Sequence, residues 1–275
     1  MAGRTGPAAG RPARAAPTPG RRVPPSDERG GIVTAFVAQL RTELALSSRQ
    51  GEQLLVSLGI PLLILVFFSS VDVLPLPPGV DEPIDFLAPG VLALAVMSTS
   101  MVSLGIGTGF ERTYGVLKRL GASPLGRPRW VAAKITTVLV TEVAQWVLLV
   151  AVAVALGWSP PASGWAVAVL GAVLGTAAFG GLGLLMAGTL PGVATLAGAN
   201  ALYLVLLLTG GMVIPLEELP GPLATVAKAL PAAPLAEVLT GSLIEGASVA
   251  PWAWISLGIW AVAAPIAAAM LFRWE

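Results

Sequence analysis

The sequence contains no cysteine and no histidine, and only 11% of its 275 residues are charged. The missing cysteines exclude disulfides, thiolate nucleophiles and Cys/His zinc sites, and the missing histidines exclude His-based acid–base catalysis. A soluble globular chain has about 25% charged and about 45–50% apolar residues. Here 55% of the residues are hydrophobic and the mean hydropathy is +0.82. So much apolar surface needs a lipid solvent, and we predict an integral membrane protein.

Six apolar stretches are long enough to cross a bilayer, whose core of about 30 Å needs about 20 helical residues. They are residues 54–70, 86–110, 135–158, 165–190, 195–216 and 252–272. Short loops rich in Lys and Arg stay in the cytoplasm. With the N-terminus inside, every Lys and Arg except Lys228 falls in an inside segment, and eight acids fall outside. We therefore predict an all-α protein with six transmembrane helices and both termini in the cytoplasm.

Three further features complete the predicted organisation. Residues 1–30 are rich in Ala, Pro, Gly and Arg, and we expect a disordered cytoplasmic tail before a single domain over residues 31–275. Residues 31–53 have helical apolar spacing interrupted by charges, which predicts an amphipathic helix along the cytoplasmic interface or packed on a cytoplasmic loop. Residues 216–250 contain four prolines and predict two short amphipathic helices on the outer bilayer surface or dipping into it.

The cytoplasmic loop at residues 111–129 has charged residues around one apolar edge formed by Tyr114, Leu117 and Leu120. This pattern fits a docking helix that ends near Gly121, and it also fits a plain basic loop. The sequence has no GxxxxGK[ST] motif, so it has no Walker-type nucleotide site. Small-xxx-small pairs such as Gly171/Gly175 and Gly188/Gly192 favour close helix packing within the chain over a dimer face.

Glu142 is the single ionisable residue deep inside a predicted span. Such a residue is by default a candidate functional site. Thr137, Thr141 and Gln145 share its helix and form a polar stripe with it. Glu142 and Gln145 are therefore candidates for a transport pathway. The alternative is a structural acid that is protonated or hydrogen-bonded to neighbouring polar groups.

Two regions of the sequence resemble the type-2 permeases of ATP-binding-cassette (ABC) exporters. The first comprises FLAPG at residues 86–90, ERTYGVLKRLGASPL at residues 111–125, and Lys134 at the start of the third span. The second comprises TGGMVIPLEELPGPL at residues 209–223 and LPAAPLAEVL at residues 230–239. Thr113, Val116 and Ala133 depart from the usual pattern, and they affect details of the loop.

The resemblance implies the membrane subunit of an ABC exporter in a prokaryotic plasma membrane. It further implies a second permease chain, identical or homologous, and two separate ATPase subunits that carry the ATP and Mg, so that this chain is no enzyme and needs no cofactor or metal. It also implies an ATPase-coupling helix, whose candidate residues here are Glu111, Arg112, Tyr114, Gly115, Leu117, Arg119 and Leu120.

Because the spans carry no ring of charges, we expect an amphiphilic substrate, with drug or antibiotic efflux as the leading function. Export of a lipid-linked glycan or another lipid is the second hypothesis. A third hypothesis is a proton-coupled secondary transporter that uses Glu142, and a fourth is a non-transporting membrane scaffold.

Overall fold

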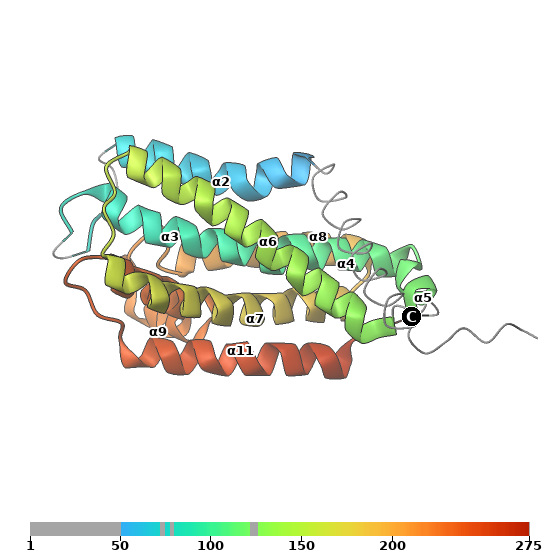
Figure 1. The fold of residues 1–275 in the computed structure, drawn as a ribbon. Helices are drawn as coiled ribbons and strands as arrows, with labels where there is room; N and C mark the ends of the chain where they lie inside the picture. Colours follow the sequence, from blue (N-terminus) through green and yellow to red (C-terminus); the bar gives the residue numbers. More distant parts are fainter. Residues whose placement is uncertain (1–50, 72–74, 78–79, 122–125, 275) are drawn as a thin grey trace, which may run out of the picture.

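The computed structural model describes residues 51–71, 75–77, 80–121 and 126–274, and every regular element within these ranges is helical. The predicted tail and residues 31–50 of the predicted interfacial helix lie outside the described residues. Figure 1 shows the long helices lying side by side along the length of the molecule, with short helices packed at one end. The main helices are α2 (Gly51–Ser70), α3 (Pro83–Met97), α4 (Leu104–Thr113), α5 (Val116–Gly121), α6 (Gly126–Ala155), α7 (Trp165–Thr189), α8 (Gly192–Thr209), α9 (Gly221–Ala229), α10 (Ala232–Leu243) and α11 (Pro251–Leu271).

Within the described residues, five helical segments are long and apolar enough to cross a membrane. They are Pro83–Thr113, Arg129–Ala155, Ala162–Thr189, Gly192–Thr209 and Pro251–Leu271. Helix α2 has 20 residues, of which Leu58–Ser70 form a shorter apolar stretch, and it packs along α3. With α2 as the remaining crossing, the bundle agrees with the predicted all-α membrane fold.

The helix from Pro83 to Thr113 forms the centre of the bundle. An 18-residue apolar stretch of this helix is 89% buried, whereas the corresponding stretch of α11 is 17% buried. It combines α3 and α4 with a π-helical segment, Ser98–Ser103, between them. Protein surrounds this helix on nearly every side, and its sequence is uncharged from residue 86 to residue 110 because charged side chains there would be buried.

Close backbone approaches explain several glycines of this core. A Cβ atom at Gly90 would lie 1.9 Å from the carbonyl oxygen of Met212, so only glycine fits there. Gly171 and Gly175 face Val238 and Leu235 of α10. The structure thus confirms that this small-residue pair serves packing within the chain.

The fifth predicted span was drawn too long, because α8 ends at Thr209 and not at residue 216. Gly210 follows the last helical residue, and Gly211 has a φ of +70°, which turns the chain out of the helix. Met212 and its apolar neighbours continue the hydrophobic run in sequence. In the structure, however, Met212 packs back into the core beside Gly90.

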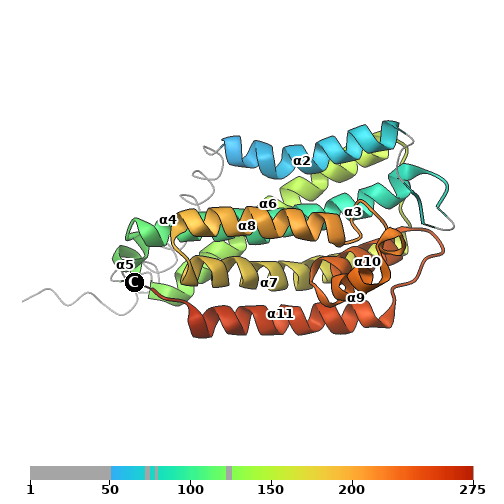
Figure 2. The same ribbon diagram turned by 180° about the vertical axis from the view of Figure 1, so that it is seen from behind.

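Helices α9 and α10 are the two short helices predicted between the last spans, and they meet at an angle of 88°. Helix α10 is almost entirely buried and packs against α3, α7 and α11. Helix α10 therefore dips into the bundle, whereas α9, in which Ala227 is the one buried residue, lies on the surface of the bundle. Trp260 donates a hydrogen bond to the carbonyl of Ala229 at 2.7 Å, which ties α9 to the first half of α11. Figure 2 shows both short helices at the end where α11 begins.

Charged residues divide between the two ends of the bundle. Arg112, Lys118, Arg129, Lys134 and Arg273 lie at one end, here called the basic end, which also carries α5 (Figure 1). The other end, here called the acidic end, carries Asp81, Glu82, Asp85, Glu217, Glu218, Glu237 and Glu245. Among the described residues at this end, Lys228 is the one basic residue. This division supports the predicted orientation, in which the basic end faces the cytoplasm.

Candidate functional site

The candidate coupling segment is bent, whereas the sequence predicted one helix over residues 111–120. Helix α4 ends at Thr113, and α5 begins at Val116. Between them the amides of Tyr114 and Gly115 donate to the carbonyls of Phe110 and Arg112. Gly115 has a φ of +69°, a conformation that costs glycine little and other residues much. Gly115 is therefore the residue that separates the end of the long central helix from α5.

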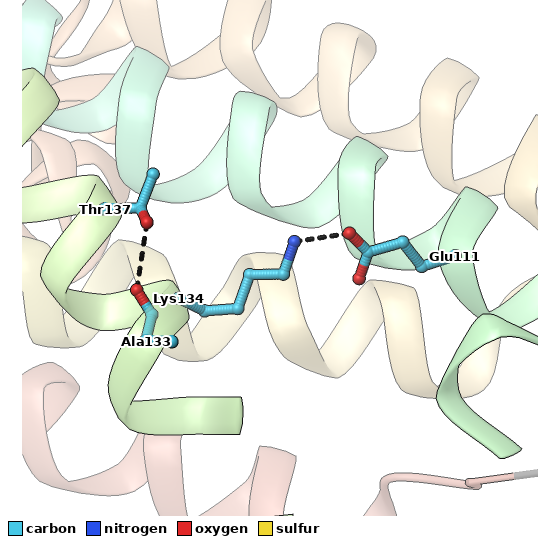
Figure 3. Close-up of polar contacts among 4 residues, drawn as sticks. All are labelled: Glu111, Ala133, Lys134 and Thr137. Carbon is cyan, nitrogen blue, oxygen red and sulfur yellow. Dashed lines mark hydrogen bonds and ion pairs between the residues drawn. The ribbon is translucent and has the colours of Figure 1, made fainter. Parts of the chain in front are cut away.

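Glu111 forms an ion pair with Lys134 of α6, shown in Figure 3. The Lys134 Nζ atom lies 2.5 Å from Oε1 of Glu111, and the two side chains are only 10% and 21% exposed. The ammonium also lies 5.8 Å from the centre of the Trp130 ring, a cation–π contact. The sequence suggested both residues as separate parts of a motif, and folding brings them together across 23 positions of the chain.

Arg112 binds the end of α7. Its guanidinium donates to the carbonyl oxygens of Gly188 and Leu190, the latter at 3.0 Å. The last carbonyls of a helix have no partner within the helix and carry partial negative charge, so a cation is favourable there. The amide of Arg273, just after α11, donates to the same Gly188 carbonyl at 3.1 Å. Arg112 thus contacts the place where α7 and the end of α11 meet.

Thr113 connects the same segment to α8. Its hydroxyl donates to the carbonyl of Gly109 at 2.9 Å and accepts a hydrogen bond from the amide of Gly192 at 3.1 Å. Gly192 is the first residue of α8, where backbone amides lack helical partners. We call Glu111, Arg112 and Thr113 the junction, because these three consecutive residues contact α6, the end of α7 and the start of α8.

Tyr114 and Leu117, two candidate ATPase-coupling residues from the predicted apolar edge, occupy opposite environments. Tyr114 is 69% exposed, and its ring stacks on Phe110 with centroids 6.1 Å apart. Leu117 is 2% exposed and packs against Trp130. Leu117 therefore holds α5 onto the bundle and cannot act as a surface anchor, which corrects the sequence-based expectation. Nothing is described of the side chains of Arg119 and Leu120, so their coupling role stays a prediction.

The polar stripe on α6 divides into two kinds of residue. The hydroxyls of Thr137 and Thr141 donate to carbonyls of their own helix. Glu142 and Gln145 instead bind other helices. Glu142 is 6% exposed and accepts a hydrogen bond from Thr176 of α7 at 2.7 Å.

Gln145 accepts a hydrogen bond from the hydroxyl of Thr99 at 2.6 Å. Thr99 belongs to the π-helical segment within the central helix, and such segments are frequent at functional sites. Sequence reasoning found Glu142 and Gln145 but missed their partners Thr99 and Thr176. A hydroxyl in an apolar span usually bonds its own helix, so the sequence carried no signal that these two cross between helices.

Comparison with known protein families gives the class of this fold. The family described as ABC-2 type transporter matches residues 34–244, which is more than half of the chain. The chain belongs to this family. It is a multi-pass membrane protein and the permease component of an ABC transporter. The permease component of such a transporter is not itself catalytic. Permeases of this family typically work with an ATPase partner. A comparison with curated proteins finds no match.

Proposed function

We propose that this permease exports an amphiphilic substrate, a drug or antibiotic, across a prokaryotic plasma membrane, driven by ATP hydrolysis in a separate subunit. The apolar character of the membrane-crossing helices supports such a cargo. In the described part of those helices, Glu142 is the one acidic or basic residue far from both ends. A path for small ions would need rings of charged side chains or carbonyl groups, so hydrophobic cargo fits this chain better than ion conduction.

The observation that carries the proposal is the junction. A partner that binds α5 and the exposed Tyr114 at the basic end pushes on a short segment bound to α6, α7 and α8 at once. Packed helices move as rigid elements, so a displacement there reaches several membrane-crossing helices together. In this proposal two ATPase subunits carry the ATP and Mg, and they serve two permease chains, identical or homologous.

Tyr114 is the residue to test for ATPase binding, because it is apolar, aromatic and exposed. Buried Tyr residues often dominate the binding energy of protein interfaces. Tyr114→Asp should reduce the amount of ATPase that co-purifies with the chain in detergent at least tenfold, since a charge would be buried in the contact. Tyr114→Phe should retain the ATPase, because it keeps the ring.

A matched control lies at the acidic end. Val226 is also apolar and exposed, and Val226→Asp should leave the co-purified ATPase unchanged. If Tyr114→Asp retained both its ATPase and ATP-dependent export, the proposed docking site would be wrong. If the unmutated chain co-purified with no ATPase, the ATP-driven mechanism itself would be refuted.

Two alternatives rest on specific features. Export of a lipid-linked glycan or another lipid fits the same apolar helices. A proton-coupled secondary transporter would use Glu142 as its proton site and would need neither partner nor ATP. Transport in vesicles that contain ATP but no proton gradient separates this last alternative from the proposal.

A further inference from the structure

We propose that the cargo is an amphiphilic monocation, an apolar body with one ammonium group, and that Oε1 of Glu142 receives the ammonium inside the membrane. This inference rests on the proposed export function and names its substrate class. Three features of the described residues support it: the bonding of the Glu142 carboxylate, the lack of a cation beside it, and an acid-lined cavity at the acidic end.

The Glu142 carboxylate has few hydrogen bonds for a buried group. Its Oε2 atom accepts from the Thr176 hydroxyl, but the same hydroxyl lies 2.8 Å from the carbonyl oxygen of Ala172. A hydroxyl has one hydrogen, so the two acceptors share it. Oε1 is buried and has no hydrogen-bond partner among the described residues. A carboxylate can accept about four hydrogen bonds, so this one has unused acceptor capacity at a defined atom.

No cation of the described chain lies beside Glu142. Lys134 lies two helical turns away on α6, and its ammonium already pairs with Glu111. The other described bases lie at the ends of the bundle, where Arg112 binds the carbonyls that end α7. Charged residues within a membrane pair with one another, line an aqueous cavity or bind a ligand. Glu142 has no such partner among the described residues, and a cationic cargo would supply one.

Exposed apolar side chains near Glu142 can bind the apolar part of the cargo. The next residue on α6, Val143, is 64% exposed, and Val147 follows one turn later with a similar exposure. On α7, Val173 is also exposed and lies three residues before Thr176. Glu142 thus lies beside uncovered apolar side chains of α6 and α7. An amphiphile can cover these side chains, and a change in the side-chain conformation of Glu142 would then bring the buried Oε1 atom to the ammonium.

A cavity at the acidic end independently favours positive charge. It has a volume of about 320 Å³, which is enough for a drug-sized molecule, and Phe86 and Ala233 form part of its apolar lining. Three acids, Glu217, Glu237 and Glu245, also line it, and its lining contains no basic residue among those described. Both the membrane interior and the predicted outer end therefore present carboxyl groups that a cationic cargo can bind.

The test compares two probes that share an apolar fluorophore and a linker and differ at the terminal amine, which is charged in one and acetylated in the other. Dansylcadaverine carries a primary ammonium on an apolar fluorophore, and its N-acetyl derivative is neutral. Equilibrium binding of each probe to the purified permease–ATPase complex is followed by fluorescence without ATP. ATP-dependent uptake of each probe into inside-out vesicles is measured with the same complex.

We expect the unmutated complex to bind the amine at least tenfold more tightly than the acetylated probe. In Glu142→Gln this preference should fall to about one, because the amide keeps the shape and removes the charge. Thr141→Val, one residue away on the same helix, should keep the preference within twofold, since the Thr141 hydroxyl bonds only its own helix in the described contacts. Glu142→Asp should retain part of the preference and serves as the second variant if the amide variant is unstable.

The outcomes separate the two proposals. Equal binding of both probes to the unmutated complex, or an unchanged preference in Glu142→Gln, would overturn the cation site. ATP-dependent uptake of the acetylated probe without preference for the amine would overturn the cargo class and leave export standing. A preference in binding that depends on Glu142, without ATP-dependent uptake of either probe, would leave the cation site standing and overturn export.

Discussion

Neutralising either partner of the Glu111–Lys134 ion pair should destabilise the protein more than neutralising both. The two side chains are largely buried, and their charged atoms lie 2.5 Å apart. Glu111→Gln removes the carboxylate that pairs with the largely buried Lys134 ammonium. Lys134→Met removes the ammonium that pairs with the Glu111 carboxylate, and it also removes the contact with the Trp130 ring. The double variant removes both members of the pair, so neither buried charge remains without this partner.

Breaking a buried ion pair by removing one partner costs about 3–5 kcal/mol. Because this pair is 10% and 21% exposed, water screens it in part, and we expect the lower end, about 3 kcal/mol for each single variant. The double variant should cost no more than either single variant. The resulting coupling energy of about 3 kcal/mol lies at the top of the range for residues in contact.

The assay is thermal unfolding in detergent, followed by the fluorescence of the chain's eight tryptophans. For a domain of this size a change of 1 kcal/mol shifts the midpoint by about 2–4 °C, so each single variant should unfold about 6–12 °C lower. The double variant should unfold no lower than either single variant. If the losses of the two single variants simply added in the double variant, the ion pair would contribute nothing, and this reasoning would be refuted.

Two further predictions concern packing. Leu117→Ala should destabilise the protein by about 2–5 kcal/mol and shift the Trp fluorescence to longer wavelength, because Leu117 is buried against Trp130; an unchanged midpoint would show that α5 does not pack there. Gly90→Ala should prevent recovery of a monodisperse protein, since its Cβ would overlap the carbonyl of Met212. Gly107→Ala is the matched control, because nothing lies within 4 Å of its Cβ, and it should be neutral or stabilise the helix by up to about 1 kcal/mol. Equal recovery of both glycine variants would contradict the close approach at Gly90.

The sequence alone determined the fold class, most helix boundaries and the family, because these depend on local quantities. Whether a helix crosses a membrane depends on the length and polarity of a continuous stretch, and the direction depends on which loops carry Lys and Arg. Both can be read without knowing any contact. The same holds for the absence of a Walker-type motif. The fifth span, which was predicted too long, shows the limit of this approach. Met212 is as apolar as the residues of the helix before it, but it lies after the end of α8 and packs into the core from a loop.

Only the tertiary structure decided which polar groups meet and which surfaces stay open. Glu111 and Lys134 are 23 residues apart, and Glu142 and Thr176 are 34 apart, so no local pattern links them. Tyr114 and Leu117 looked equivalent on one helical edge until the turn at Gly115 exposed one and buried the other. Helical spacing fixes the direction of a side chain only while the helix continues. Beyond a break, and between helices, packing of the whole bundle sets it.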